Sequence, residues 1–368
     1  MAIKIASSEK DTVDDAVGEL VTLLGPNNMK MLIYFASTKF PPEKISAKMQ
    51  SAFPEVTVFG CSTAGEIVSG KMLRDAVVAM AFDEESLLEV KVEVIEKLSG
   101  RIDINDAFGS FEKHFGEAAY DMRPSQYLGI ILVDGMCGRE ERLMDVVGDK
   151  TNVLFIGGSA ADDLEFQASF VYAKGKSYTD AAVLALIKPT APFDLVKTQS
   201  VREMGPVLVV TKANEDRREI VEFNNKPASK AYAEALGVSV NELAACFPYH
   251  PLGLVIDGEP YIRSPTHISG DRVAFQCSSV EGMPLSLLEL TNLIDDTKEA
   301  LARSKAKLGG ISGVIVFNCV HRTLELEHKK LSDQYGELFA DVPTIGFNSY
   351  GEQFIGHLNQ TATMIVFR

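Results

Sequence analysis

Short apolar runs separated by helical patterns recur along this chain. Residues 31–37 and 76–82 carry almost no polar side chains, which is typical of strands that are buried on both faces. Residues 11–24 place apolar side chains three and four positions apart, which predicts an amphipathic helix. Residues 41–49 begin with two prolines and predict a second helix, since proline is tolerated in a first turn. This alternation predicts an α/β fold.

The same order of strand, helix, strand, small-residue loop and strand occurs three times. In two copies the first strand ends 23 residues before the glycine that opens the loop, from Ser37 to Gly60 and from Asp134 to Gly157. A third copy runs from residue 313 to residue 367, with a longer helical connection. Repeats of this kind pack their strands together. The sequence therefore predicts mixed β-sheets flanked by helices and built from repeated β-α-β-β units.

The region between the second and third copies has a different pattern. Asp257 and Gly258 lie between two apolar runs, which predicts a β-hairpin, and residues 286–304 predict a long helix. We therefore expect two domains. The first covers residues 28–197 and holds two copies, and the second covers residues 221–354 and holds the hairpin region and the third copy.

Each small-residue loop contains a carboxylate, and superposing the copies without gaps places Glu66, Asp163 and Glu352 at one position. Two interpretations are open: each carboxylate accepts backbone N–H groups and stabilises its own loop, or the three serve a shared chemistry. A dinucleotide site is excluded because a strand, not a helix, follows every loop.

Charge and cysteine content limit the function classes. The net charge of −15 and the pI near 4.9 make nucleic acid and anionic membranes unsuitable ligands, since both require clustered Lys and Arg. No apolar run approaches the roughly 20 residues of a membrane span, and no signal peptide is recognised, so we expect a cytoplasmic protein. Five widely spaced cysteines predict reduced thiols.

Among the six histidines, His250 stands out because it lies between Tyr249 and Pro251 in an otherwise apolar stretch. It is either a core histidine with a satisfied hydrogen bond or the single protein ligand of a group such as haem. His267 and then His114 follow it as candidates. No nucleophile with an oriented base is found, so we expect no enzymatic activity.

Four segments of the chain together resemble the FIST sensory domains, which are signal-input modules for small ligands. The first two segments are similar to FIST N and the last two to FIST C. They are Gly60-Cys61-Ser62-Thr63-Ala64-Gly65-Glu66-Ile67, residues 157–163, the block from His250-Pro251-Leu252-Gly253 to Arg263-Ser264-Pro265, and residues 346–352.

Within this family the chain most resembles the NosP-type haem proteins, which sense nitric oxide and regulate a histidine kinase. The resemblance implies haem b, bound without covalent attachment because the chain has no CxxCH motif. His250 is then the expected iron ligand, with His267 as runner-up, and Tyr249, Pro251 and Arg263 are expected to line the cofactor. The implied partners are nitric oxide and a histidine kinase.

The alternative is a FIST sensor without haem that binds an amino acid or similar metabolite. In that case Glu66, Asp163, Arg263 and Glu352 are expected to line the pocket, because an arginine and carboxylates suit a zwitterion. The sequence leaves the oligomeric state open, a homo-oligomer included.

Overall fold

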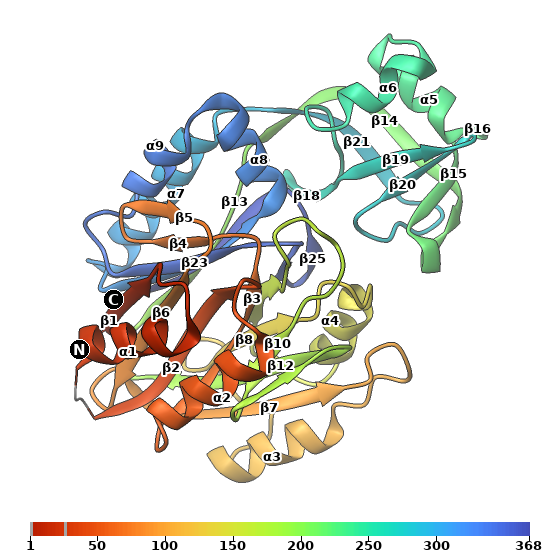
Figure 1. Cartoon of the computed structure of the whole chain (residues 1–368). Helices are drawn as coiled ribbons and strands as arrows, with labels where there is room; N and C mark the ends of the chain where they lie inside the picture. The colour runs from red at the N-terminus through yellow and green to blue at the C-terminus, as the bar shows by residue number, and fades with distance from the viewer. Residues whose placement is uncertain (1–2, 26–27) are drawn as a thin grey trace. The chain divides into compact units, whose positions relative to one another are not determined.

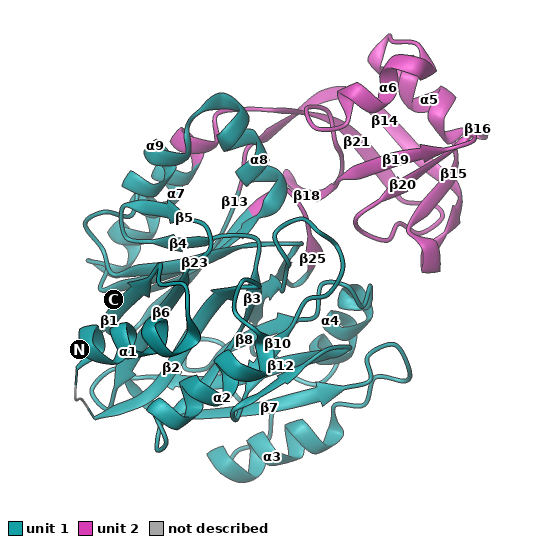
Figure 2. Ribbon diagram, viewed as in Figure 1, with its two compact units in different colours: residues 1–198, 297–356, 362–368 teal, residues 199–296, 357–361 magenta. Residues whose placement is uncertain are grey.

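The computed structural model describes residues 3–25 and 28–368, which form two compact units (Figure 2). Unit 1 comprises residues 1–198, 297–356 and 362–368, and unit 2 comprises residues 199–296 and 357–361. These units differ from the predicted domains 28–197 and 221–354, because the third copy packs with the first two in unit 1. Unit 2 is an insertion into that third copy.

The three copies of unit 1 share one order of elements (Figure 1). A strand and a helix come first, then two strands joined by one or two helices, then a short hairpin and a last strand. The first copy contains β1 (Ile3–Ser8), α1 (Val13–Leu24), β2 (Met29–Ser37), α2 (Pro42–Ala52), β3 (Thr57–Thr63), β4 (Glu66–Val68), β5 (Lys71–Leu73) and β6 (Val77–Asp83).

The second copy contains β7 (Leu87–Glu96), α3 (Asn105–Phe115), β8 (Leu128–Val133), α4 (Glu140–Gly148), β9 (Phe155–Ser159), β10 (Val171–Ala173), β11 (Lys176–Tyr178) and β12 (Ala181–Pro189). The third copy contains β13 (Phe193–Gln199), α7 (Leu293–Leu308), β22 (Gly313–Cys319), α8 (Val320–Lys329), α9 (Ser332–Glu337), β23 (Thr344–Ser349), β24 (Glu352–Phe354), β25 (Gly356–Leu358) and β26 (Thr361–Phe367). The predicted mixed α/β fold with repeated β-α-β-β units is confirmed.

Each copy gives its hairpin to the sheet of another copy. The strand orders are β1-β6-β2-β3-β10-β11, β7-β12-β8-β9-β24-β25 and β13-β26-β22-β23-β4-β5. The first copy thus completes the third sheet, the second completes the first, and the third completes the second. Within each copy the two strands joined by the helical connection are parallel, and the remaining pairs are antiparallel, so all three sheets are mixed.

The inner strands of unit 1, such as β2, β8 and β22, are buried on both faces because helices cover one side and the other sheets cover the other. Along β2, Ile33 and Phe35 belong to the central core, whereas Leu32 and Tyr34 pack with the helices α1 and α2. The Phe35 ring lies 4.7 Å from the Phe347 ring of the third copy, so the sheets share one core. The apolar runs without alternation follow from this double burial.

The glycine that opens each small-residue motif is required by the close approach of a parallel neighbour. A Cβ atom at Gly60 would lie 1.8 Å from Tyr34 O, and at Gly157 it would lie 1.7 Å from Ile131 O. At Gly346 the distance to the carbonyl oxygen of Val316 would be 2.4 Å. The glycine at the start of each motif is therefore required by a packing constraint that all three copies share. The motif also continues as strand through Thr63 rather than forming the expected loop from Gly60 onward.

Unit 2 is built on one sheet with the order β18-β17-β21-β14-β15-β20-β19, and β16 pairs with β15. Its elements are β14 (Val201–Asn214), the 3₁₀ turn η1 (Glu215–Arg217), β15 (Glu219–Phe223), β16 (Lys226–Pro227), α5 (Ala228–Leu236), α6 (Val240–Cys246), β17 (Leu252–Ile256), β18 (Glu259–Arg263), β19 (Pro265–Ser269), β20 (Arg272–Phe275) and β21 (Pro284–Leu290). The helices α5 and α6 pack on the apolar cluster of this sheet.

One expected element of this region is correct and one is wrong. The hairpin is present between β17 and β18, and Asp257 and Gly258 both have positive φ, as its two-residue turn requires. The long helix expected over residues 286–304 is wrong in its first part, because residues 286–290 belong to β21, where Leu287 and Leu288 are buried. Over the described ranges 3–25 and 28–368, no helix is long and apolar enough to cross a membrane.

Candidate functional site

His250 lies in the turn that joins α6 to β17 in unit 2. Its backbone N–H donates to Cys246 O at 2.9 Å, and its carbonyl oxygen accepts a hydrogen bond from the Tyr232 hydroxyl. The side chain is half-buried, and within the described chain its buried Nδ1 atom has no hydrogen-bond partner. Buried polar atoms are usually paired, so this imidazole nitrogen is available to a ligand.

The two neighbours of His250 fix its backbone from both sides. Tyr249 O accepts from Leu290 N at 3.3 Å, and Pro251 O accepts from Leu288 N at 2.9 Å. Both donors belong to β21. The Tyr249 side chain is 42% exposed, whereas Pro251 is buried. The imidazole is therefore carried on a backbone that is anchored to the sheet of unit 2.

Arg263 ends β18, where it pairs with Leu252 at the start of β17. Its Nη1 atom lies 3.4 Å from Ile262 O and 3.5 Å from His357 O, which are long contacts for hydrogen bonds. The Nε atom is buried without a partner. Within the described residues this guanidinium has no carboxylate partner, so a half-buried positive charge is left uncompensated.

The segment 357–361 belongs to unit 2 and lies against these residues. Asn359 Oδ1 accepts a hydrogen bond from the Cys277 thiol at 2.7 Å, and Gln360 Nε2 donates to Pro248 O at 3.2 Å. The Asn359 Nδ2 and Gln360 Oε1 atoms are buried without a partner among the described residues, as is the hydroxyl of Ser264. We define the His250 cluster as His250, Arg263, Ser264, Asn359 and Gln360.

The other two histidine candidates have different surroundings. His267 is exposed on β19, and its Nδ1 atom lies 3.0 Å from Thr266 Oγ1. His114 lies on α3 in unit 1, where its Nε2 atom is 3.0 Å from a carboxylate oxygen of Glu89. Neither imidazole combines burial with an unpartnered nitrogen.

Two of the predicted pocket carboxylates are buried inside their own motifs. Glu66 accepts hydrogen bonds from the Thr63 hydroxyl and from Ala76 N, the latter at 3.1 Å. Glu352 accepts from the Ser349 hydroxyl at 2.6 Å. Burial raises the pKa of Glu66 from 4.5 to about 8 against the opposing effect of these bonds. Glu66 is therefore protonated at neutral pH.

Asp163 is not the structural equivalent of Glu66 and Glu352. In the strand pairings between copies, Gly60 pairs with Tyr172, Gly346 with Ile67 and Gly157 with Gln353. The residue before each of these partners is Val171, Glu66 and Glu352. Val171 thus occupies the carboxylate position in the second copy and lies eight positions beyond Asp163, so the gapless superposition was wrong there.

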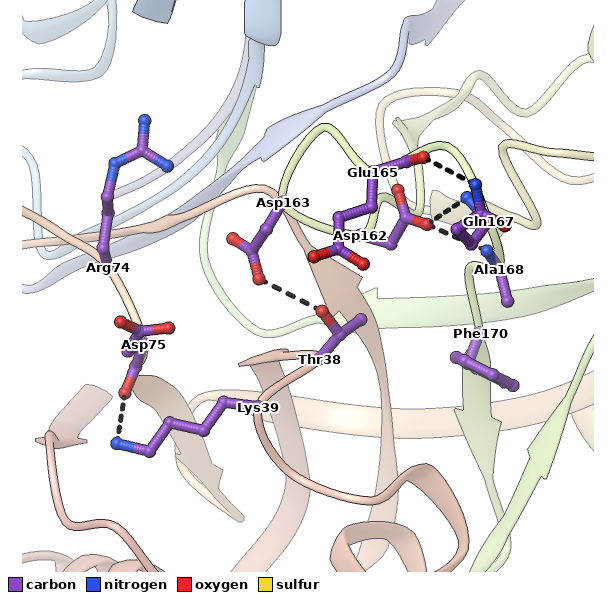
Figure 3. Close-up of a pocket in the computed structure, with 10 residues that line it drawn as sticks. All are labelled: Thr38, Lys39, Arg74, Asp75, Asp162, Asp163, Glu165, Gln167, Ala168 and Phe170. Carbon is purple, nitrogen blue, oxygen red and sulfur yellow. Dashed lines mark hydrogen bonds between the residues drawn. The ribbon is translucent and has the colours of Figure 1, made fainter.

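The extra residues of the second copy line a cavity of about 540 Å³ in unit 1 (Figure 3). Asp163 accepts hydrogen bonds from the hydroxyls of Ser37 and Thr38, at 3.2 and 3.1 Å. Its pKa is raised, mainly by burial, with Asp75 adding repulsion. The residues that line the cavity carry both signs of charge and are Thr38, Lys39, Arg74, Asp75, Asp162, Asp163, Glu165, Gln167, Ala168 and Phe170.

The cations of this cavity are already paired. Lys39 Nζ lies 2.9 Å from Asp11 Oδ1, and Arg74 Nη2 lies 2.5 Å from a carboxylate oxygen of Glu327. Asp162 has a structural role, since its carboxylate accepts three backbone N–H groups from residues 166–168 and the Tyr350 hydroxyl.

The structure does not join the four predicted pocket residues in one unit. Glu66, Asp163 and Glu352 belong to unit 1 and Arg263 to unit 2. Sequence reasoning missed Asn359 and Gln360, because their contacts come from residues about a hundred positions away. It also missed Lys39, Arg74 and the insertion after Ser159. A gapped comparison of the three copies is the signal that could have found the insertion.

Two family models and one relative match the chain. The FIST N domain model matches residues 30–226, and the FIST C domain model matches residues 228–355. The uncharacterized protein MJ1623 of Methanocaldococcus jannaschii is 24% identical over an alignment of 278 positions that covers 68% of this chain and 53% of that protein. The chain thus spans about half the length of this curated relative. Because the FIST N match alone covers more than half of the sequence, the chain belongs to the FIST family of sensory domains.

Proposed function

We propose that this protein is a sensor whose ligand binds unit 2 at the His250 cluster, and that this ligand is a non-covalent haem b. Nitric oxide is then the signal, and a histidine kinase is the partner that receives it. The observation that carries the proposal is the buried Nδ1 atom of His250, which has no partner among the described residues.

The residues of the cluster fit haem b in two respects. A neutral imidazole with an available nitrogen is what an axial position requires of a protein. Arg263 offers an uncompensated positive charge to a propionate. When bound, haem supplies the iron that nitric oxide recognises.

The chain's own contribution is to hold the imidazole in place. Backbone hydrogen bonds to Cys246 O and from the Tyr232 hydroxyl restrain His250, while the Tyr232 ring stacks on Phe247 with centroids 5.7 Å apart. Rigid support of this kind keeps a ligating side chain in one orientation. Residues 357–361 of unit 2 are flanked by residues 356 and 362 of unit 1, which lie in β25 and β26. A change at the cluster is therefore transmitted to unit 1 through the chain itself.

The test is a titration of the whole chain with haem, followed by absorption spectroscopy. We expect a Soret band that shifts on addition of nitric oxide and that is lost or displaced in His250→Ala. His267→Ala is the matched control, because this imidazole is exposed on the same unit. Absence of a Soret band, or an identical band in His250→Ala, rules out the haem assignment.

A second candidate function is a haem-free sensor of an amino acid, which the cavity of unit 1 favours. Of the predicted pocket residues, Asp163 lines this cavity. Lys39 and Arg74 supply the positive charge that was expected of Arg263. Carboxylates of Asp75 and Asp163 suit an ammonium group. Lys39 and Arg74 can exchange their exposed partners, Asp11 and Glu327, for a ligand carboxylate.

A thermal-shift screen against the amino acids tests this second candidate. A ligand that binds the folded state raises the melting temperature. The increase should be lost in Asp163→Asn and kept in Glu9→Gln, an exposed carboxylate on the same unit. If no amino acid raises the melting temperature, or Asp163→Asn responds like the wild type, the cavity is not an amino-acid site.

A further inference from the structure

Unit 2 holds several buried polar side-chain atoms that have no hydrogen-bond partner among the described residues. Besides the His250 nitrogen, four of them lie in the His250 cluster: Arg263 Nε, Ser264 Oγ, Asn359 Nδ2 and Gln360 Oε1. Ser264 is 2% exposed and Asn359 is 0% exposed, so neither side chain is open to bulk water. Folded proteins rarely leave such groups unpaired, and their presence together in the His250 cluster indicates a ligand.

Hydrogen bonds place the three residues in one neighbourhood. Arg263 and Ser264 are consecutive, and Ser264 O accepts from Gln276 N at 2.9 Å, next to Cys277. The Cys277 thiol donates to Asn359 Oδ1 at 2.7 Å. Arg263 Nη1 lies 3.5 Å from the carbonyl oxygen of His357, two residues before Asn359. Contacts on both sides thus bring the β18 end and the segment 357–361 together.

The Arg263, Ser264 and Asn359 atoms can donate, whereas Gln360 Oε1 can only accept. A guanidinium nitrogen can only donate, and a serine hydroxyl can do so by rotation. Asn359 Oδ1 accepts a hydrogen bond from the Cys277 thiol, and the NH₂ group is the end of this amide that has no partner. One positive charge and three donors match an oxyanion with a single negative charge, which is a carboxylate.

We propose that Arg263, Ser264 and Asn359 form a carboxylate-recognition site on unit 2. The site binds the carboxylate of the ligand, and Arg263 compensates its negative charge. The proposal rests on the sensor role of the His250 cluster but not on haem, since any ligand with a carboxylate satisfies the same donors.

The test compares carboxylates with their neutral counterparts on the full chain. Succinate should raise the melting temperature in a saturable way, whereas succinamide should not, because the amide carries no charge. Arg263→Gln should weaken succinate binding at least tenfold, and Asn359→Asp should abolish it by adding a negative charge. Arg272→Gln is the matched control, since Arg272 lies on the same unit and pairs with Glu219 at 2.9 Å.

A parallel titration with haem b and with its dimethyl ester separates this inference from the proposed function. If succinate binds in an Arg263-dependent way but no Soret band forms, the carboxylate site stands and the haem assignment falls. If haem binds through His250 but its ester binds equally tightly and succinate has no effect, the carboxylate site is overturned while the haem sensor stands. Succinate binding that is unchanged in Arg263→Gln also overturns the site. Circular dichroism of each variant shows that it is folded.

Discussion

The first and third copies of unit 1 differ from the second at one connection. In the first and third copies two residues join the parallel strand to the hairpin, and a buried glutamate closes the turn by accepting a hydroxyl hydrogen bond. The second copy has Val171 at that position and eight additional residues before it. In the first and third copies this connection therefore stabilises the turn, whereas in the second copy it lines a cavity.

The comparison distinguishes motif positions that stabilise every copy from positions that shape a feature of only one copy. The opening glycine is common to all copies because every copy brings a carbonyl oxygen against it. The carboxylate is common only where the short turn needs an acceptor. Substitutions at shared and unshared positions should consequently have different costs.

The largest effect is expected at the shared glycines. Gly157→Ala places a Cβ 1.7 Å from Ile131 O, which forces β8 and β9 apart. We expect a loss of about 3 kcal/mol or more in the free energy of unfolding, measured with urea, or failure to fold. Gly109→Ala is the control: this exposed helical glycine has open space around it and should gain about 0.5–1 kcal/mol. A Gly157→Ala protein as stable as the wild type contradicts the packing role.

Removing the carboxylate that shapes the insertion should also have a large effect. Asp162→Ala leaves three backbone N–H groups without an acceptor, at positions 166, 167 and 168. We expect a loss of about 2–3 kcal/mol and faster proteolysis within residues 163–168. Glu165→Ala changes an exposed carboxylate of the same connection and should alter neither measurement.

The buried Glu66 should make stability depend on pH. The folded state keeps its proton up to about pH 8, whereas the unfolded chain releases it near 4.5. The folded state therefore binds more protons between these values, so stability should fall as pH rises through this window, by roughly 1.4 kcal/mol per pH unit.

Glu66→Gln mimics the protonated side chain and tests this directly. Its urea midpoint should lack the part of the pH dependence that Glu66 contributes, while remaining close to the wild type near pH 5. Equal slopes for both proteins between pH 5 and 8 would show that Glu66 is ionised in the folded state.

The smallest effect is expected at Asp163. An asparagine oxygen can still accept from Ser37 and Thr38, and the substitution removes repulsion from Asp75. Asp163→Asn should change the free energy of unfolding by less than about 1 kcal/mol. A cost as large as that of Asp162→Ala would give Asp163 the same structural role and remove the contrast between the copies.

The repeat and its strands could be predicted because local patterns define them. The step from Ser37 to Gly60 is the same as that from Asp134 to Gly157, and both glycines meet the same constraint. The exchange of hairpins between copies could not be predicted, because the pairing of β10 with β3 joins distant parts of the chain and leaves no local pattern. The position of Asp163 was misjudged for this reason.

The candidate site was predictable only in part. His250 was identified because Pro251 follows it in an apolar stretch, and these features are local. Asn359 follows the small-residue motif of the third copy, and no local sequence pattern indicated that it lies near Arg263. The two are brought together by the return of residues 357–361 to unit 2.

The circular exchange of hairpins has a consequence for how the three copies can exist. Each sheet takes its edge strands from another copy, so no copy forms a complete sheet from its own residues. Contacts of this head-to-tail kind close into a ring after three steps, and ring closure does not require that the copies be covalently linked. Three separate chains of one copy each could satisfy the same pairings. A homotrimer of single copies therefore suffices to explain the origin of unit 1. Fusion of three copies into one gene allows each copy to change independently, as the second copy has.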